Sequence, residues 1–131
     1  IKRLAGKFDR VLVDAPCSGL GTLRRNPDLK WRQTPATVTE LTVKQGAILA
    51  SAARLVKAGG RLVYATCSLL AEENEAIVEA FLAGHPDFTL KPAGAVLAEQ
   101  GVDLAMADFL RLNPLDHGTD GFFAAVLERK A

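Results

Sequence analysis

Short apolar runs alternate along this 131-residue chain with a longer segment in which apolar positions recur at helical spacing. The runs at residues 8–14 and 61–66 have the length and the β-branched or aromatic content of buried strands. Between them, one predicted helical face is formed by Leu41, Ile48, Leu49, Ala52, Leu55 and Val56. The order strand, helix, strand predicts a parallel βαβ unit.

Local signals predict where that helix begins and ends. Thr37, followed three positions later by Glu40, fits a capping box, so we expect the helix to begin there. Gly59 and Gly60 stand directly before the second strand and are expected to end the helix in a left-handed cap.

A second helix is predicted after the second strand. It follows Cys67 and ends at Gly84 and Pro86, residues that commonly terminate helices. Because the helix dipole favours negative charge near an N-terminus, three acidic residues are expected in or near the first turn: Glu72, Glu73 and Glu75.

The C-terminal third of the chain predicts short strands. Residues 88–90 fit a short strand, whereas residues 93–106 fit either a loop or a weak helix. Residues 109–112 and 122–128 are separated by a turn-rich link, which predicts an antiparallel hairpin. The predicted fold class is therefore α/β, with parallel strands and a C-terminal antiparallel hairpin in one domain over residues 1–131.

The composition agrees with a folded domain, because 49% of the residues are hydrophobic. No apolar run approaches the roughly 20 residues that a membrane-spanning helix needs. Two cysteines are too few for a secreted disulfide framework. The first residues show no signal-peptide pattern, and we therefore expect a cytoplasmic protein.

The net charge is +1, so no overall electrostatic field indicates a polyanionic partner. A local basic segment, residues 24–32, is the exception, because only Asp28 opposes its charge there. Its cations surround Trp31 and are Arg24, Arg25, Lys30 and Arg32. The composition of this basic segment fits an RNA-facing surface and a solvated loop about equally well.

Both cysteines follow the end of a predicted strand, and each is followed by a serine. A buried reduced cysteine often serves only as a small hydrophobic side chain. Cys17 and Cys67, however, are flanked by polar or turn-forming residues, which favours chemically competent thiols. Because the thiolate is the reactive form, a catalytic site would need nearby positive charge or backbone donors.

Asp14 ends the first predicted strand, where its carboxyl group is either held by loop amides or presented to a ligand; the residues alone leave both open. The segment 19–21 (GLG) does not fit a dinucleotide loop, because Arg24 stands where the third glycine would fall.

Zinc and redox chemistry are two further alternatives for the cysteines. Zinc could in principle bind Cys17, Cys67, His85 and His117, but no pair has the close spacing of structural zinc sites. We therefore expect no metal. The Cys-x-x-Cys motif of thiol redox proteins is also absent from the sequence.

Four segments together are more specific than any one of them. They are residues 14–22 (DAPCSGLGT), 24–28 (RRNPD) with 30–31 (KW), 65–68 (ATCS) with 72–75 (EENE), and 117–123 (HGTDGFF). In this order, and across nearly the whole chain, they resemble the RNA 5-methylcytosine methyltransferases of the Sun/Fmu type.

The resemblance implies S-adenosylmethionine-dependent methylation of cytosine carbon 5 in RNA, with small-subunit ribosomal RNA as the substrate. It implies that Cys67 is the nucleophile that adds to carbon 6 of the base, which makes carbon 5 reactive towards the methyl group. It associates Cys17 with release of the product and Asp14 with contact to the cofactor or the target base. The basic segment would face the RNA.

The family fold is a Rossmann-like methyltransferase sheet, in which residues 8–14 would be the fourth strand. Nothing in residues 1–131 matches the glycine-rich cofactor loop of the first strand or the acidic residue of the second. We therefore expect the C-terminal portion of a catalytic domain, with an incomplete cofactor site and without the RNA-binding domain. The alternative is an inactive fragment that acts only as an RNA-binding or structural module. An exposed edge at residues 8–14 would favour self-association.

Overall fold

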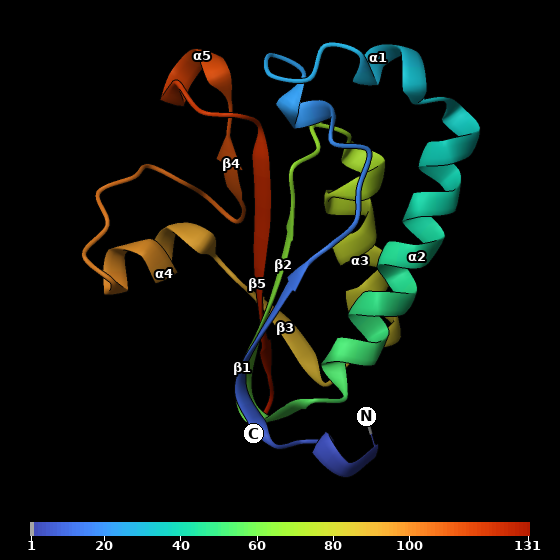
Figure 1. Ribbon diagram of the computed structural model, residues 1–131. Coiled ribbons are helices and arrows are strands. Elements are labelled where there is room, and N and C mark those ends of the chain that lie inside the picture. Colours follow the sequence, from blue (N-terminus) through green and yellow to red (C-terminus); the bar gives the residue numbers. More distant parts are fainter. Residues whose placement is uncertain (1) are drawn as a thin grey trace.

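The computed structural model describes residues 2–131, which form a mixed sheet with helices on both sides (Figure 1). The strands are β1 (Phe8–Asp14), β2 (Val56–Thr66), β3 (Phe88–Lys91), β4 (Leu110–Leu112) and β5 (Phe122–Arg129). The α-helices are α1 (Leu29–Arg32), α2 (Pro35–Ala53), α3 (Glu75–Gly84), α4 (Ala93–Glu99) and α5 (Pro114–His117). Short 3₁₀ turns are η1 (Lys2–Leu4), η2 (Leu20–Thr22) and η3 (Ala71–Glu73).

The sheet has the order β1-β2-β5-β3, and β4 also pairs with β5. β1 and β2 are parallel, with Val13 opposite Tyr64 and Asp14 opposite Ala65. β5 runs antiparallel to β2, β3 and β4. The predicted βαβ unit and the predicted antiparallel hairpin are therefore both confirmed.

The core lies where α2 and α3 cover one face of the sheet (Figure 1). Its largest fully buried apolar side chains come from α2, β2 and β5: Leu49, Leu62, Tyr64, Phe123 and Leu127. Fully burying one such side chain contributes about 1.5–3 kcal/mol, so this layer holds the βαβ unit together.

The boundaries of the first helix differ from the prediction. Thr34, not Thr37, is the N-cap, and its hydroxyl accepts the amide of Thr37 at 3.2 Å. Pro35 occupies the first helical position, where its missing N–H has no consequence. Thr37 completes the box from the third helical position, because its hydroxyl accepts the Thr34 amide at 2.9 Å.

The end of that helix was also predicted wrongly. α2 ends at Ala53, and Gly59 lies inside β2 with φ +74°. The pairing of β1 with β2 shifts there, between Phe8 and Arg10, so Gly59 belongs to a strand irregularity and not to a helix cap. Val56, expected on the helix, begins β2, and Ile48 on the predicted apolar face is 39% exposed.

The second predicted helix is divided into η3 and α3, and it ends at Gly84 as expected. Glu75 begins α3, but Glu73 lies before it in η3 and is fully buried. β3 is confirmed, and the uncertain stretch 93–106 contains α4 followed by irregular chain.

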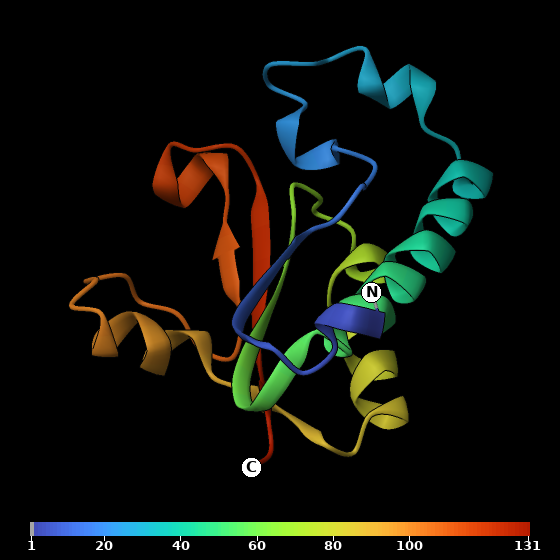
Figure 2. The ribbon, with the colours of Figure 1, turned by 60° about the horizontal axis from the view of Figure 1, so that its bottom comes forward.

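β1 lies at one end of the strand order and exposes apolar side chains, with Leu12 68% exposed. Figures 1 and 2 show the loop after β1, the turn after β2 and α5 at the same end of the sheet. Because β1 and β2 are parallel, that end collects the residues that follow both strands.

Candidate functional site

The two thiols meet at the carboxyl ends of β1 and β2. Cys17 follows β1 after a two-residue link, Ala15 and Pro16, and Cys67 comes directly after β2. The amide of Ala15 donates to the carbonyl of Ala65 at 2.9 Å, which extends the parallel pairing to the edge of the site. The two Sγ atoms are 3.4 Å apart, and both side chains are partly buried. The structure thus places the two candidate cysteines in direct contact.

Burial raises the pKa of the Cys17 thiol to about 12, and the hydrogen bond with Cys67 acts in the same direction. Cys17 is therefore protonated at neutral pH. A protonated thiol is a poor nucleophile but a proton donor, and the atom nearest to it in this contact is the Cys67 sulfur.

Three backbone segments close tightly around this pair. The amide of Gly21 donates to the Cys67 carbonyl at 2.8 Å, and the amide of Gly121 donates to the Gly21 carbonyl at 2.7 Å. A Cβ on Gly21 would lie 2.6 Å from the Cys67 carbonyl oxygen and closer still to that of Gly121. Only glycine allows this approach, so the loop after β1 is fixed to the turn after β2 and to the start of β5.

The serines that follow the cysteines share one buried carboxylate. Glu73 accepts the Ser18 amide at 2.7 Å and the Ser18 hydroxyl at 2.6 Å, and it also accepts the Ser68 hydroxyl. Gln45 of α2 donates to it at 3.1 Å. Sequence analysis expected Glu73 in or near the first turn of a helix and did not assign it to the site. The repeated Cys-Ser pair is the feature from which a shared partner of the two loops could have been inferred.

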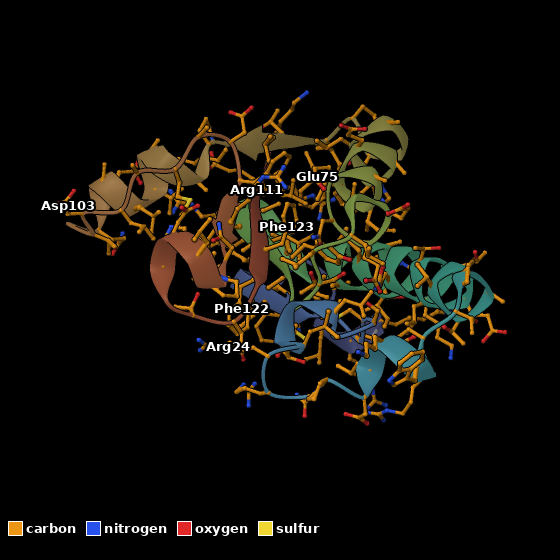
Figure 3. The ribbon with its side chains drawn as sticks, turned by 90° about the horizontal axis from the view of Figure 1, so that it is seen from above. Arg24, Glu75, Asp103, Arg111, Phe122 and Phe123 are labelled. Atoms are coloured by element: carbon orange, nitrogen blue, oxygen red, sulfur yellow. The ribbon has the colours of Figure 1, made fainter. Side chains whose placement is uncertain are left out.

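The basic segment is divided between two environments. Arg24 and Arg25 both bind Asp120, at 3.0 and 2.6 Å, although their side chains remain 48% and 61% exposed. The bond from Arg25, with Arg24 beside it, lowers the pKa of Asp120. Figure 3 shows Arg24 at the same end of the molecule as Phe122, which follows Asp120 by two positions.

The other two cations of the basic segment lie on α1. Lys30 lies over the ring of Trp31, 4.9 Å from its centroid, and Arg32 pairs with Asp28 at 2.8 Å. The four predicted RNA-facing residues are therefore exposed, and they divide into a pair that binds Asp120 and a pair on α1.

A further arginine, Arg111, lines a small pocket together with Ser68, beside the site. Arg111 of β4 pairs with Glu75 at the start of α3 and lies 5.5 Å from the centroid of the Phe123 ring (Figure 3). This contact joins β4 to α3 across the end of β5. Sequence analysis did not single out Arg111.

Asp14 ends β1 with an exposed side chain. A groove of about 450 Å³ lies between the N-terminal half of α2 and the loops that carry the cysteines, and Asp14 is not among its lining residues. Its lining includes residues three positions after each cysteine, Leu20 and Leu70.

Both histidines have local partners away from the thiols. His85 stacks on Phe81, with ring centroids 4.0 Å apart, and Nδ1 of His117 accepts the amide of Asn113 at 3.1 Å. Within residues 2–131, no group of three His, Cys, Asp or Glu side chains is arranged to hold a metal ion. No helix in that range is long and apolar enough to cross a membrane.

Solved structures with the same fold identify its class. The crystal structure of PH0851 matches with a TM-score of 0.84 at 43% identity, over 95% of this chain and 27% of that protein. The structure of NSun6 from Pyrococcus horikoshii with SFG matches with a TM-score of 0.72 at 29% identity, over 92% of this chain and 29% of that one. The fold is that of the Rossmann-like methyltransferases.

Sequence comparison then gives the family. A model described as 16S rRNA methyltransferase RsmB/F matches residues 1–128, and the chain belongs to that family. A relative from Synechocystis, named probable ribosomal RNA small subunit methyltransferase B, is 49% identical over 121 residues, which cover 92% of this chain and 27% of the relative. The chain thus spans about a quarter of the length of the curated relatives it matches.

Proposed function

We propose that this chain carries the base-attacking chemistry of an S-adenosylmethionine-dependent RNA methyltransferase that modifies carbon 5 of cytosine in small-subunit ribosomal RNA. The observation that carries the proposal is the contact of two free thiols, 3.4 Å apart, at the carboxyl ends of two parallel strands. Ligand sites of open α/β sheets lie at this edge. The names of the relatives supply the substrate class.

Cys67 is the proposed nucleophile. Its thiolate adds to carbon 6 of the cytosine, and the electron pair displaced from the ring makes carbon 5 nucleophilic. Bound S-adenosylmethionine supplies the methyl group that carbon 5 takes up. A base then takes the proton from carbon 5, the electron pair of that C–H bond restores the double bond between carbons 5 and 6, and the bond from carbon 6 to sulfur breaks to return the Cys67 thiolate and the methylated base.

Cys17 has a complementary role in the last step. Because burial keeps Cys17 protonated, its thiol can donate a hydrogen bond to the Cys67 sulfur as negative charge returns to that atom. A donor at this position stabilises the leaving thiolate and so favours release of the product.

Asp14 is the residue of this chain that we propose to contact the cofactor or the target base. Its side chain is exposed at the end of β1, three positions before Cys17. The cofactor carries a cationic sulfonium, an ammonium group and ribose hydroxyls, all of which suit an acidic partner. The relative NSun6 was solved with SFG, an analogue of S-adenosylmethionine, which agrees with the proposed cofactor.

The proposal is tested by cysteine substitutions in the full-length protein. Cys67→Ala is expected to abolish methyl transfer and to form no covalent complex with RNA. Cys17→Ala is expected to accumulate a denaturation-resistant protein–RNA adduct, because attack proceeds but release does not. Methylation by Cys67→Ala at the normal rate would overturn the assignment of the nucleophile.

A second candidate is a module without methyltransferase activity that binds RNA through the basic segment, and the exposure of Arg24, Arg25 and Arg32 favours it. Calorimetry with S-adenosylmethionine separates the two. Micromolar binding to this chain alone would exclude the inactive module, whereas RNA binding without cofactor binding would support it.

A further inference from the structure

Glu73 is the largest buried acidic group that the proposed reaction does not use. Its side chain is fully buried, and among residues 2–131 no Lys or Arg side chain forms an ion pair with it. A buried carboxylate without a cation is costly unless several donors satisfy it. Here the donors come from the loops after β1 and β2 and from α2.

The two loops contact this carboxylate in the same way. The Ser18 hydroxyl oxygen accepts the amide of Leu20 at 3.4 Å, and the Ser68 hydroxyl oxygen accepts the amide of Leu70 at 3.1 Å. Both hydroxyls donate their protons to the same oxygen, Oε2 of Glu73. Each cysteine is therefore followed by a serine that closes a local turn with its hydroxyl oxygen and donates its hydroxyl proton to Glu73.

We propose that Glu73 is a positioning residue that sets the mutual placement of the Cys17 and Cys67 thiols through Ser18 and Ser68. The inference deepens the proposed function, on which it rests, because attack and release need the two thiols in fixed relation to one base. The hydrogen bonds of the Glu73 carboxylate go to Ser18, Ser68 and Gln45, so its proposed effect on the thiols acts through the two serines.

The chemistry of the pocket requires a carboxylate and not an amide. Oε1 accepts two N–H groups, from Ser18 and Gln45, and Oε2 accepts two hydroxyl protons. An amide nitrogen in either position would place N–H groups against donors, or would leave at least one serine proton without an acceptor. Such a loss inside a buried network costs more than an ordinary hydrogen bond.

The test is the rate at which diamide joins Cys17 to Cys67 in this chain. Two thiols lose two hydrogens and two electrons to form the disulfide, and the azo group of diamide is reduced to the hydrazine. The sulfur atoms must approach from 3.4 Å to about 2.05 Å, so the rate reports their placement. The rate is divided by the alkylation rate of the same thiols with iodoacetamide, which reports exposure instead.

Glu73→Gln is expected to lower this ratio on the order of tenfold, because small misplacements of reacting groups have effects of this size. Glu75→Gln is the matched control: it removes a carboxylate two positions away that pairs with Arg111, and the ratio should stay at the wild-type value. The fall must come from the diamide rate: a lower ratio produced only by faster alkylation of both cysteines would indicate general loosening and would contradict the proposal. A folded Glu73→Gln chain with the wild-type ratio would overturn the proposal.

If circular dichroism shows Glu73→Gln to be unfolded, Ser18→Ala and Ser68→Ala replace it. Each substitution removes one of the two hydroxyl groups that donate to Glu73 and keeps the carboxylate. A lower ratio in both variants supports the positioning role, and a wild-type ratio in either contradicts it. Neither RNA nor cofactor enters this assay, so its failure is distinguishable from failure of the proposed methyl transfer.

Discussion

The Cys17 thiol is a weaker acid than an ordinary cysteine, because its partly buried position penalises the thiolate. This has a consequence for stability at high pH. The unfolded chain loses the Cys17 proton near the reference pKa of 9.0, whereas the folded chain keeps it until about 12. The stability that the protonated thiol contributes is therefore complete below pH 9.0 and is lost as the pH rises towards 12.

We predict that Cys17→Ser flattens the alkaline loss of stability. The free energy of unfolding, measured by urea denaturation under reducing conditions, should fall less steeply above pH 9.0 in the variant than in the wild type. Tyr64, whose pKa burial also raises, remains in both chains, and the part of its rise that comes from Cys17 is lost in the variant, which flattens the alkaline slope in the same direction. Identical alkaline slopes would contradict the raised pKa of Cys17.

Asp120 fixes the two exposed arginines that precede the basic helix α1. Without its carboxylate, Arg24 and Arg25 lose the partner that ties their loop to the start of β5. We predict that Asp120→Asn makes trypsin cleave after Arg24 and Arg25 several-fold faster, because local opening exposes the chain.

Asp9→Asn is the control for this cleavage, since Asp9 forms an exposed ion pair with Lys57 at a distant site. Mass spectrometry of the early fragments identifies the bonds cut. Equal rates in wild type and Asp120→Asn would show that the ion pairs do not order the loop.

At this scale the sequence indicated candidate residues but not how they meet. Cys17, Cys67 and Asp14 were singled out because each stands at or just after a strand end. Glu73 was assigned to a helix terminus, because its acidic neighbours suit one. Its burial depends on Ser18, 55 positions away, and local periodicity carries no information about such a contact.

Among the elements, β1 was predicted with the correct limits because its apolar run is bounded by polar residues on both sides. The limits of α2 were wrong because two signals overlapped. Thr34 and Thr37 are both capping residues, and Pro35 decides between them by favouring the first helical position. Gly59 resembles a helix cap in sequence, yet sheet pairing places it inside β2.

Alanine substitutions at two glycines test the packing between elements, and we expect them to change the free energy of unfolding in opposite directions. Gly21→Ala should lower the free energy of unfolding by about 1–3 kcal/mol, because its Cβ meets backbone oxygens of two other segments. Gly46→Ala should raise it by about 0.5–1 kcal/mol, because the site lies within α2 and no atom lies within 4 Å of the added Cβ.

Urea denaturation of the two variants measures both effects. A stabilising Gly21→Ala would mean that the loop after β1 is not held against Cys67 and Gly121. A destabilising Gly46→Ala would mean that this face of α2 is covered.

For the whole molecule, the exposed edge of the sheet is the feature with the largest consequence. β1 has a neighbour on one side, and Leu12 and Phe8 are 68% and 40% exposed. Unpaired strand edges with apolar side chains favour pairing with a second chain. We predict concentration-dependent self-association of the wild type in size-exclusion chromatography.

Leu12→Lys should shift the elution towards the monomer, since a charge on an edge strand opposes pairing. Leu115→Lys is the matched control, because Leu115 is 92% exposed but lies on α5, away from β1. A wild type that elutes as a monomer at every concentration would contradict the prediction.

β5 follows the other four described strands in the sequence, yet it occupies the middle of the sheet. β5 pairs with β2, β3 and β4, so these three strands have no common partner until residues 122–129 have left the ribosome. Contacts between distant parts of a chain form slowly, and unpaired strands are exposed in the meantime. A chain that stops before residue 122 would therefore keep only the β1–β2 pair of this sheet and would leave β3 and β4 unpaired.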